Sequence, residues 1–456
     1  MMDLAIAARE TGGTLSGSNV TFTTVGTDSR RVVPGELFVA LSGERFDGHA
    51  FVAQALAQGA SCAMVSRIDP MLRNASLVVV DDTLAALGRL AAAWRARMTL
   101  PLVLVVGSNG KTTVKEMIAA ALAAHYGADA VLATRGNLNN AIGLPLTLLK
   151  LLPSHRAAVV ELGMNHRGET GELAPLAAPA IVVVNNAQRE HQEFMNGVAD
   201  VAAEHADAIL ALPREGVAVI NADDAHVDTW RAAAARAGVH AVGFGFTPSA
   251  DVRATLTQAP GRSTLAITTP SGVAELELAV PGLPMARNAL AACAAALAAG
   301  AALPAIVRGL ALFRPVPGRL DTRTLASGAV VIDDSYNANP DSVRAAIDVL
   351  ARARGERWLV LGDMGEVGAQ GPAFHREVGL YARSAGLDRL HTVGELASHA
   401  AQAFGAQARH FDSVTALSAA LAHEIRGGVT VLVKGSRFMR MERVVAALAG
   451  DAVAEH

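Results

Sequence analysis

Residues 102–115 read LVLVVGSNGKTTVK, and no other stretch constrains the chain as strongly. The apolar run Leu102–Val106 predicts a buried strand. A turn between Gly107 and Gly110 follows, and a helical pattern begins at Lys111. This order of elements directs backbone N–H groups and one ammonium group at a phosphate. The alternative is an ordinary turn between a strand and a helix.

The motif is shorter than the strict phosphate loop, because Val105 stands six residues before the lysine where that loop has glycine. Gly110 lets the backbone approach a phosphate closely. We expect Lys111 to neutralise the terminal phosphates of a nucleotide and the Thr112 hydroxyl to bind Mg²⁺. The residues predicted to bind the nucleotide are Gly107, Ser108, Asn109, Gly110, Lys111, Thr112 and Thr113.

Length and charge limit what kind of protein this is. A chain of 456 residues is too long to fold around one hydrophobic core. At about 150 residues per domain, this length suggests about three domains. The formal net charge is −3 and no dense run of Lys and Arg occurs, so we expect no nucleic-acid partner.

Three features concern the compartment. Cys62 and Cys293 are isolated, which fits a reducing cytoplasm and core packing rather than a disulfide. The N-terminus lacks the basic and apolar regions of a signal peptide. The uncharged run Ala289–Val307 is long enough for a membrane span, but it is mostly alanine and is interrupted by glycine and proline. We expect a buried helix ending near Ala299 and no membrane span.

The middle of the chain repeats one theme, an apolar strand whose carboxyl end carries a polar cluster. The clusters read GSNGKTT, GMNHRGE, NNAQREH and NADD, with helical segments between them. This pattern predicts a parallel sheet, and ligands bind beyond the carboxyl ends of such strands. We therefore expect all four clusters to face one crevice. Residues 250–281 alternate like an antiparallel appendage.

Two boundaries divide the chain into α/β units. Leu100–Pro101 ends the first unit, and the sequence FRPVPGR at residues 313–319 ends the second. The predicted domains are 1–99, 100–314 and 315–456, and the last again alternates strands with helices.

Two strand-end residues of the middle unit are candidate metal ligands. Glu161 ends the strand AAVVEL, where a buried carboxylate needs a partner. We expect it to bind Mg²⁺; a salt bridge or a helix cap is the alternative. His191, in NNAQREHQEF beside Glu190, is unusual for Mg²⁺ but can complete an oxygen-rich shell. A structural histidine is the alternative there.

The last unit contains a further candidate in VVIDDSYNANPDS. We expect Asp334 and Asn337 to contact the ribose and phosphates of a nucleotide. The alternative is a capping turn in which Asp341 or Ser342 is the N-cap of the next helix.

Together the motifs GSNGKTT, ELGMNHRGE, DDSYNANP, LGDMGE and VLVKGSR resemble the Mur ligases of peptidoglycan assembly. The resemblance covers nearly the whole chain. Its closest likeness is to ligases that add D-alanyl-D-alanine to a UDP-N-acetylmuramoyl-tripeptide. It implies a small N-terminal α/β domain for the UDP-sugar, a central P-loop ATPase-like domain with a parallel sheet, and a Rossmann-like C-terminal ligase domain. The implied reaction passes the γ-phosphate of ATP to a substrate carboxylate, and an amine then attacks the acyl phosphate.

The resemblance also assigns roles to single residues. It makes Lys111, Glu161, His191 and Arg319 catalytic, with Thr112, Glu161 and His191 at Mg²⁺. Asn288 matches an asparagine beside adenine, Arg319 an arginine at ATP phosphate, and Asp334 a nucleotide contact. The implied substrate-binding residues are Ser29, Arg30, Gly43, Asp47, Gly48, His49, Asn137 and Asn140.

Two positions depart from the family pattern. Many Mur ligases have a carbamylated lysine after the histidine motif, but no lysine lies between Lys150 and Lys434 here. We hypothesise that Glu204, or a carboxylate in REHQE, supplies the missing negative charge. The family also usually has His-Asn where this chain has Pro284–Met285.

Other functions stay open from sequence alone. A related ligase adding meso-diaminopimelate or glutamate would share the ATP chemistry, and a P-loop ATPase without ligase activity would use GSNGKTT alone. We expect a monomer. The third residue of the acceptor peptide is not specified by the sequence.

Overall fold

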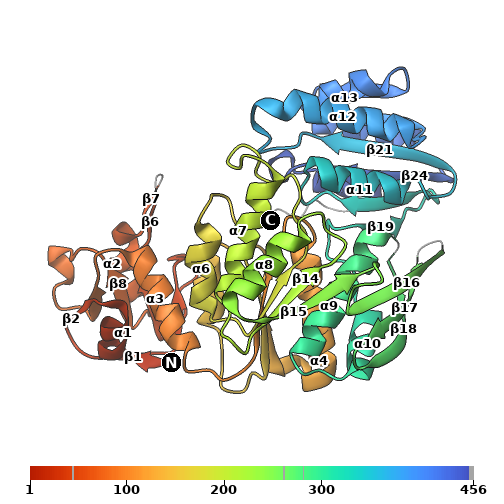
Figure 1. Cartoon of the computed structure of the whole chain (residues 1–456). Coiled ribbons are helices and arrows are strands. Elements are labelled where there is room, and N and C mark those ends of the chain that lie inside the picture. The colour runs from red at the N-terminus through yellow and green to blue at the C-terminus, as the bar shows by residue number, and fades with distance from the viewer. Residues whose placement is uncertain (44–45, 260–261, 281, 451–456) are drawn as a thin grey trace.

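The computed structural model describes residues 1–43, 46–259, 262–280 and 282–450, and these ranges form three α/β lobes in chain order (Figure 1). The N-terminal lobe lies beside the central lobe, and the C-terminal lobe lies above it on the other side. Within those ranges no helix combines the length and apolar character needed to cross a bilayer.

The N-terminal lobe is a small sheet, parallel apart from one edge strand, with helices against it. The strand order is β2 (Thr14–Ser16), β9 (Leu77–Val79), β8 (Cys62–Val65), β5 (Glu36–Val39), β4 (Thr24–Gly26). Two short pairs flank it, β1 (Met2–Asp3) with β3 (Thr21–Phe22) and β6 (Ser42–Gly43) with β7 (Phe46–Asp47). The helical segments are α1 (Leu4–Thr11), η1 (Gly48–Phe51), α2 (Val52–Ala57), η2 (Pro70–Leu72) and α3 (Thr83–Arg95).

The central lobe is built on the predicted parallel sheet. Its order is β11 (Val131–Ala133), β12 (Ala157–Glu161), β10 (Leu102–Val106), β13 (Ile181–Val184), β14 (Val217–Asn221), β15 (His240–Gly245), β16 (Val252–Ala259), β17 (Arg262–Thr269), β18 (Gly272–Leu278). The last three strands pair antiparallel, as predicted for residues 250–281, and β16 continues the sheet beside β15. Pro281 of that segment lies outside the described residues.

The alternation of β10 explains how the sheet is covered on both faces. Leu102, Leu104 and Val106 belong to one core cluster, and Val103 and Val105 belong to the other. The first face is covered by α5 (Gly143–Leu148), α6 (Glu169–Ala177), α7 (Val198–Leu210) and α8 (Val227–Ala237). The second is covered by α4 (Lys111–Tyr126), α9 (Leu283–Ala298) and α10 (Leu303–Ala311), and η3 (Ala128–Ala130) follows α4. The predicted buried helix ending near Ala299 is confirmed as α9, whose C-cap is Ala299.

The C-terminal lobe repeats the two-layer covering on a smaller sheet. The order is β19 (Asp321–Thr324), β20 (Val330–Asp334), β24 (Val429–Lys434), β21 (Glu356–Gly362), β22 (Arg389–Val393), β23 (Ala408–Phe411), parallel apart from the edge strand β19. One face packs on α11 (Pro340–Leu350), α12 (Gly371–Ser384) and α13 (Ala397–Phe404), the other on α14 (Val414–Glu424) and α15 (Glu442–Ala449). Two short turns, η4 (Gly368–Gln370) and η5 (Arg437–Met439), complete it.

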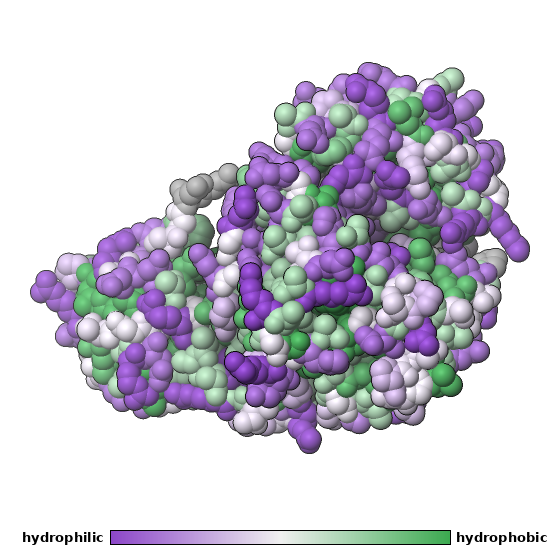
Figure 2. Space-filling model, viewed as in Figure 1, coloured by the Kyte–Doolittle hydropathy of each residue, from purple (hydrophilic) through white to green (hydrophobic). Residues whose placement is uncertain are grey.

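The lobes are joined in two different ways. The first and central lobes share one hydrophobic core, and Trp94 of α3 donates its indole N–H to the Leu151 carbonyl at 3.0 Å. Arg95, also buried, donates to the Ala177 carbonyl at the end of α6 at 2.9 Å. The C-terminal lobe keeps its own cores, and on the face shown in Figure 2 its surface is largely hydrophilic. The C-terminal lobe therefore has hydrophobic cores of its own, distinct from the core clusters of the rest of the chain.

Candidate active site

A crevice of about 770 Å³ lies where the carboxyl ends of β10, β12 and β13 face the C-terminal lobe. Most residues predicted for the nucleotide, the metal and the reaction line it, together with two of the predicted substrate-binding residues, Asn137 and Asn140. They are Ser108, Asn109, Gly110, Lys111, Thr112, Thr113, Asn137, Asn140, Glu161, His191, Asn288, Arg319, Asp334 and Asn337. The structure thus gathers these residues from both lobes into one space.

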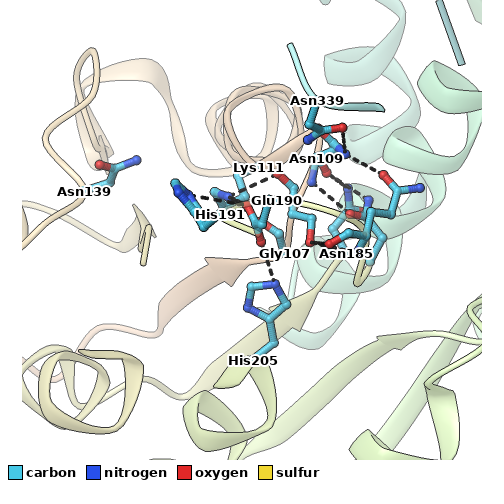
Figure 3. Close-up of polar contacts among 12 residues, drawn as sticks. Gly107, Asn109, Lys111, Asn139, Asn185, Glu190, His191, His205 and Asn339 are labelled. Carbon is cyan, nitrogen blue, oxygen red and sulfur yellow. Dashed lines mark hydrogen bonds and ion pairs between the residues drawn. The ribbon is translucent and has the colours of Figure 1, made fainter. Parts of the chain in front are cut away.

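The loop between β10 and α4 is held open by the segment after β13 (Figure 3). The Asn186 side chain accepts from the Asn109 backbone N–H at 2.8 Å, and the Asn185 side chain donates to the Asn109 carbonyl at 2.7 Å. Lys111, the first residue of α4, turns its ammonium back toward the Gly107 and Ser108 carbonyls. The loop therefore presents a helix N-terminus and one lysine to the crevice, as an anion site requires.

Gly110 is the position where this loop needs glycine. Its φ of +82° lies in the left-handed region, and a Cβ there would lie 2.8 Å from the side-chain atoms of Asn185 and Asn288. Asn288 itself is hydrogen-bonded to Asn185 at 3.1 Å, behind the loop. Its predicted contact with adenine stays a prediction.

Thr112 and Glu161 form the best candidate for a metal site. The Thr112 hydroxyl lies 2.8 Å from one Glu161 oxygen, and Asn139 donates to the other oxygen at 2.8 Å. Glu161 is buried, which favours a role that neutralises its charge. No three His, Cys, Asp or Glu side chains of the described ranges gather as a metal cluster. The donor set fits Mg²⁺, which keeps water and phosphate oxygens in its shell.

Glu190 supplies a second carboxylate beside the phosphate loop. Its Oε2 lies 3.4 Å from Lys111 Nζ and 3.9 Å from His191 Nε2, and its Oε1 lies 3.2 Å from His205 Nε2 of α7 (Figure 3). Burial alone would raise the pKa of Glu190, but the charge of Lys111 and the hydrogen bond with His205 outweigh it and lower the pKa to about 2. Glu190 is therefore a negative charge beside Lys111 in the crevice.

The hypothesis that Glu204 supplies this charge is wrong. The Glu204 carboxylate accepts from the backbone N–H groups of Gly168 and Thr170, both at 2.8 Å. It thereby satisfies the free N-terminus of α6 and does not line the crevice. The alternative in the same hypothesis, a carboxylate of REHQE, agrees with the position of Glu190.

His191 lies at the border between the lobes. Its Nδ1 is 2.7 Å from Glu366 Oε2 of the C-terminal lobe, and the imidazole lowers the pKa of that carboxyl. Both residues have positive φ, +48° for His191 and +57° for Glu366, which is rare for residues with side chains. Such strain clusters at functional sites. The structure shows no bond from His191 to Thr112 or Glu161, so its place at a metal stays a prediction.

The C-terminal wall carries the positive charges that a nucleotide needs. Lys434 Nζ lies 2.5 Å from Asp334 Oδ2 and donates to the Asn337 carbonyl at 3.0 Å. The Arg319 guanidinium stacks over the Tyr336 ring at 4.2 Å. Its Nε is buried and has no hydrogen-bond partner among the described residues. A buried guanidinium nitrogen without a partner fits a residue that binds an anionic group such as a phosphate.

The turn SYNANP both caps a helix and touches the phosphate loop. The N-cap of α11 is Asn339, with Ser342 completing a capping box, so the alternative that Asp341 or Ser342 is the N-cap is wrong. The Asn339 amide also pairs with the Asn109 amide through bonds of 2.9 and 3.3 Å. The phosphate loop and the C-terminal lobe are therefore in direct contact.

Arg189 connects the central and C-terminal lobes through its guanidinium. Its guanidinium donates to Asp341 at 2.6 Å and to Glu377 at 2.7 Å, and it lies over the Phe374 ring at 5.2 Å. Those partners belong to α11 and α12 of the C-terminal lobe. Glu190 and His191 come directly after Arg189, so this bridge fixes the segment that carries them.

The fourth polar cluster, NADD, does not face the crevice, and that expectation is wrong. Asp224 accepts from the Ala187 N–H at 3.1 Å, and Asp223 accepts from the Phe246 N–H at 2.9 Å. Both carboxylates are used to hold neighbouring loops at the strand ends. Strand β14 lies one place farther from β10 than β13 does, so its end is displaced from the phosphate loop.

The other predicted substrate-binding residues, Ser29, Arg30, Gly43, Asp47, Gly48 and His49, lie in the first lobe and not in the crevice lining. Asp47 Oδ1 contacts His49 Nδ1 at 2.7 Å, and His49 Nε2 accepts the Ser66 N–H at 2.9 Å. The His49 backbone N–H and the Arg67 guanidinium lower the pKa of Asp47. Gly48 packs against the chain at Leu41, where a Cβ would lie 2.6 Å from a carbonyl oxygen.

The other first-lobe residues are more exposed. Arg30 pairs with Asp28 at 2.8 Å in the same turn as Ser29, and Gly43 pairs with Phe46 in the β6–β7 hairpin. Residues 44 and 45 of the loop from 43 to 49 lie outside the described residues. Ser66 and Arg67 were missed from sequence, because only the fold brings their segment to Asp47.

Comparison with known proteins finds one family model for each of the three lobes. Three family models match: "Mur ligase family, catalytic domain" at residues 21–95, "Mur ligase middle domain" at 105–296, and "Mur ligase, glutamate ligase domain" at 318–437. The chain is 42% identical over 442 residues to the UDP-N-acetylmuramoyl-tripeptide--D-alanyl-D-alanine ligase of Escherichia coli strain K12, covering 96% of each chain. It is 33% identical to the enzyme of that name from Bacillus subtilis strain 168, covering 92% of each.

Solved structures agree in shape. MurF from Acinetobacter baumannii superposes with a TM-score of 0.91 at 33% identity, covering 99% of both chains. The MurF ligase from Thermotoga maritima, solved in complex with ADP, gives a TM-score of 0.83 at 26% identity, covering 94% of this chain and 97% of its own.

Proposed function

This chain belongs to the Mur ligase family, and we infer from that membership that it is an ATP-dependent ligase joining D-alanyl-D-alanine to a UDP-N-acetylmuramoyl-tripeptide. The observation that carries the inference is the crevice, where a phosphate loop of one lobe faces basic residues of another. The two alternatives, a different amine and an ATPase without ligase activity, are not favoured, because the relatives aligned over nearly the whole chain are named for this reaction.

The chemistry has two steps. A carboxylate oxygen of the tripeptide attacks the terminal phosphorus of ATP, and the bond to ADP breaks. The amine of D-alanyl-D-alanine then attacks the acyl carbon, phosphate leaves with its oxygen, and the amine loses a proton as the amide forms. A free carboxylate acylates poorly, so the phosphoryl group supplies the leaving group that the second step needs.

The chain contributes position and charge to both steps. We propose that Lys111 and the N-terminus of α4 hold the terminal phosphates and that Arg319 approaches them from the C-terminal wall. Thr112 and Glu161 would hold Mg²⁺, which neutralises phosphate charge when bound. Glu190 keeps Lys111 in place. The C-terminal lobe covers the crevice and excludes water, which would hydrolyse an acyl phosphate.

The remaining assignments are also proposals. Residues 1–99 would bind the UDP-sugar through the Asp47–His49 turn, 100–314 would bind ATP, and 315–456 would bring the amine. We further propose a monomer, because one chain supplies both walls of the crevice, and a cytoplasmic enzyme, because Cys62 and Cys293 are free and buried.

The test measures ADP release with the UDP-N-acetylmuramoyl-tripeptide, with and without D-alanyl-D-alanine. We expect sustained ADP release and one new amide product only when both are present. Parallel reactions with meso-diaminopimelate and glutamate test the amine. ADP release that is equally fast without either substrate would favour a simple ATPase and overturn the proposal.

A further inference from the structure

His205 is a buried histidine whose imidazole makes one hydrogen bond within the part of the chain that the structure describes. The residue, on α7, is 2% exposed, and its Nε2 lies 3.2 Å from Glu190 Oε1 (Figure 3). Its Nδ1 has no hydrogen-bond partner among the described residues. A carboxylate offers only acceptors, so the proton of this contact is on Nε2. Burying Nδ1 without a partner costs free energy, and the hydrogen bond between Nε2 and Glu190 offsets part of that cost.

Glu190 depends on that bond for its orientation. It lies in the irregular segment after β13, and its two oxygens point to different partners. Oε1 accepts the hydrogen bond from His205 Nε2, and Oε2 points toward Lys111 Nζ, 3.4 Å away. Without His205, Oε1 loses this partner, and only the longer contacts of Oε2 with Lys111 and His191 restrain the last torsion of the carboxylate, which is a soft one. The side chains of His205 and Glu190 thus connect helix α7 with Lys111 of the phosphate loop.

We propose that His205 is a positioning residue for the ligation reaction: it orients Glu190, and Glu190 in turn places the Lys111 ammonium at the terminal phosphates of ATP. The proposal rests on the proposed function and adds a residue that touches no substrate. His205 itself does not line the crevice.

A double-mutant cycle separates this role from simple packing. The variants are His205→Ala, Glu190→Gln and the pair, assayed for kcat, for the KM of D-alanyl-D-alanine, and for affinity toward a non-hydrolysable ATP analogue with Mg²⁺. We expect His205→Ala to lower kcat by about 10–100-fold, as outer partners of active-site groups do, with little change in that KM. The pair should be no slower than Glu190→Gln alone. His205→Gln, whose amide can donate in the same direction, should recover most of the loss.

The matched control is Glu204→Gln, the neighbouring buried carboxylate on α7, which contacts α6 and not the crevice. We expect normal kcat and unchanged affinity for the analogue. Two results would overturn the proposal. One is a double variant whose loss of kcat is the product of the losses in His205→Ala and Glu190→Gln, and the other is full activity of His205→Ala. If His205→Ala does not fold, the cycle is run with His205→Leu, and the same two outcomes decide.

Failure of the proposed function is distinguishable from failure of this inference. If the wild-type chain makes no product from D-alanyl-D-alanine, the ligase proposal fails. The cycle measured on binding of the ATP analogue still tests whether His205 acts through Glu190, because that binding needs no acceptor or amine.

Discussion

Removing the Arg189 side chain should loosen the C-terminal lobe. Arg189 is 20% exposed and donates to two carboxylates across the crevice, Asp341 at 2.6 Å and Glu377 at 2.7 Å. A hydrogen bond to a charged group contributes about 1.5–3 kcal/mol, and partial exposure favours the lower end of that range for each pair. Arg189→Ala should therefore weaken the contact of the C-terminal lobe with the central lobe by about 3 kcal/mol, which is somewhat more than 100-fold in an equilibrium constant.

The assay is a distance distribution between labels on two lobes. Met71 in the first lobe is 91% exposed and Glu395 in the C-terminal lobe is exposed, so cysteines placed there accept labels. The native Cys62 and Cys293 are buried and should stay unlabelled. Arg189→Ala should broaden the distribution and lengthen the mean distance in the absence of ligand.

Arg344→Ala is the matched control. Arg344 bonds Glu377 at 2.9 Å within the C-terminal lobe, and within the described ranges it makes no hydrogen bond or ion pair with the other lobes. It should leave the distance distribution unchanged. The reasoning is refuted if Arg189→Ala also leaves it unchanged, or if both variants open the crevice equally.

Two further predictions concern stability and nucleotide binding. Burial lowers the pKa of His391 to about 4, so as pH falls the imidazole is protonated in the unfolded chain before it is protonated in the folded chain. Between pH 7 and pH 5 the free energy of unfolding of the wild type should therefore fall by about 2 kcal/mol more than that of His391→Leu. Urea titration followed by Trp358, whose ring lies 5.4 Å from His391, measures this, and equal losses would contradict it. Gly110→Ala should weaken binding of an ATP analogue by about tenfold or more, because its Cβ would meet two asparagine side chains. Gly127→Ala at the other end of α4, also at positive φ but facing open space, should bind normally; equal affinities would contradict the steric argument.

Local sequence signals were enough to predict the phosphate-binding element. The apolar run before Gly107 gave a strand with both faces buried, and the glycines and Lys111 marked the turn and the helix start. These signals lie within a dozen residues, so no knowledge of distant segments was needed. The parallel direction of the central strands was also predicted, from the alternation of strand and helix patterns, but their order in the sheet was not.

Contacts between distant segments could not be predicted. Asp341 is 152 residues from Arg189, and nothing near either residue specifies the other. The error at Glu204 has a local cause. Neighbouring helix residues point about 100° apart, so Glu204 faces α6 while His205 faces Glu190, and sequence alone did not fix the rotation of α7. The expectation that NADD faces the crevice was wrong for another reason. The sequence predicts that this cluster follows a strand, but not how far that strand lies from the phosphate loop in the sheet.

The most direct test of the account follows one oxygen atom. The acceptor tripeptide is prepared with heavy oxygen in its terminal carboxylate, and the phosphate released during ligation is analysed by mass spectrometry. If the carboxylate takes the terminal phosphoryl group of ATP beside Lys111, each phosphate carries one labelled oxygen, and Lys111→Ala stops both label transfer and amide formation. Unlabelled phosphate released together with normal amide product would contradict the central claim.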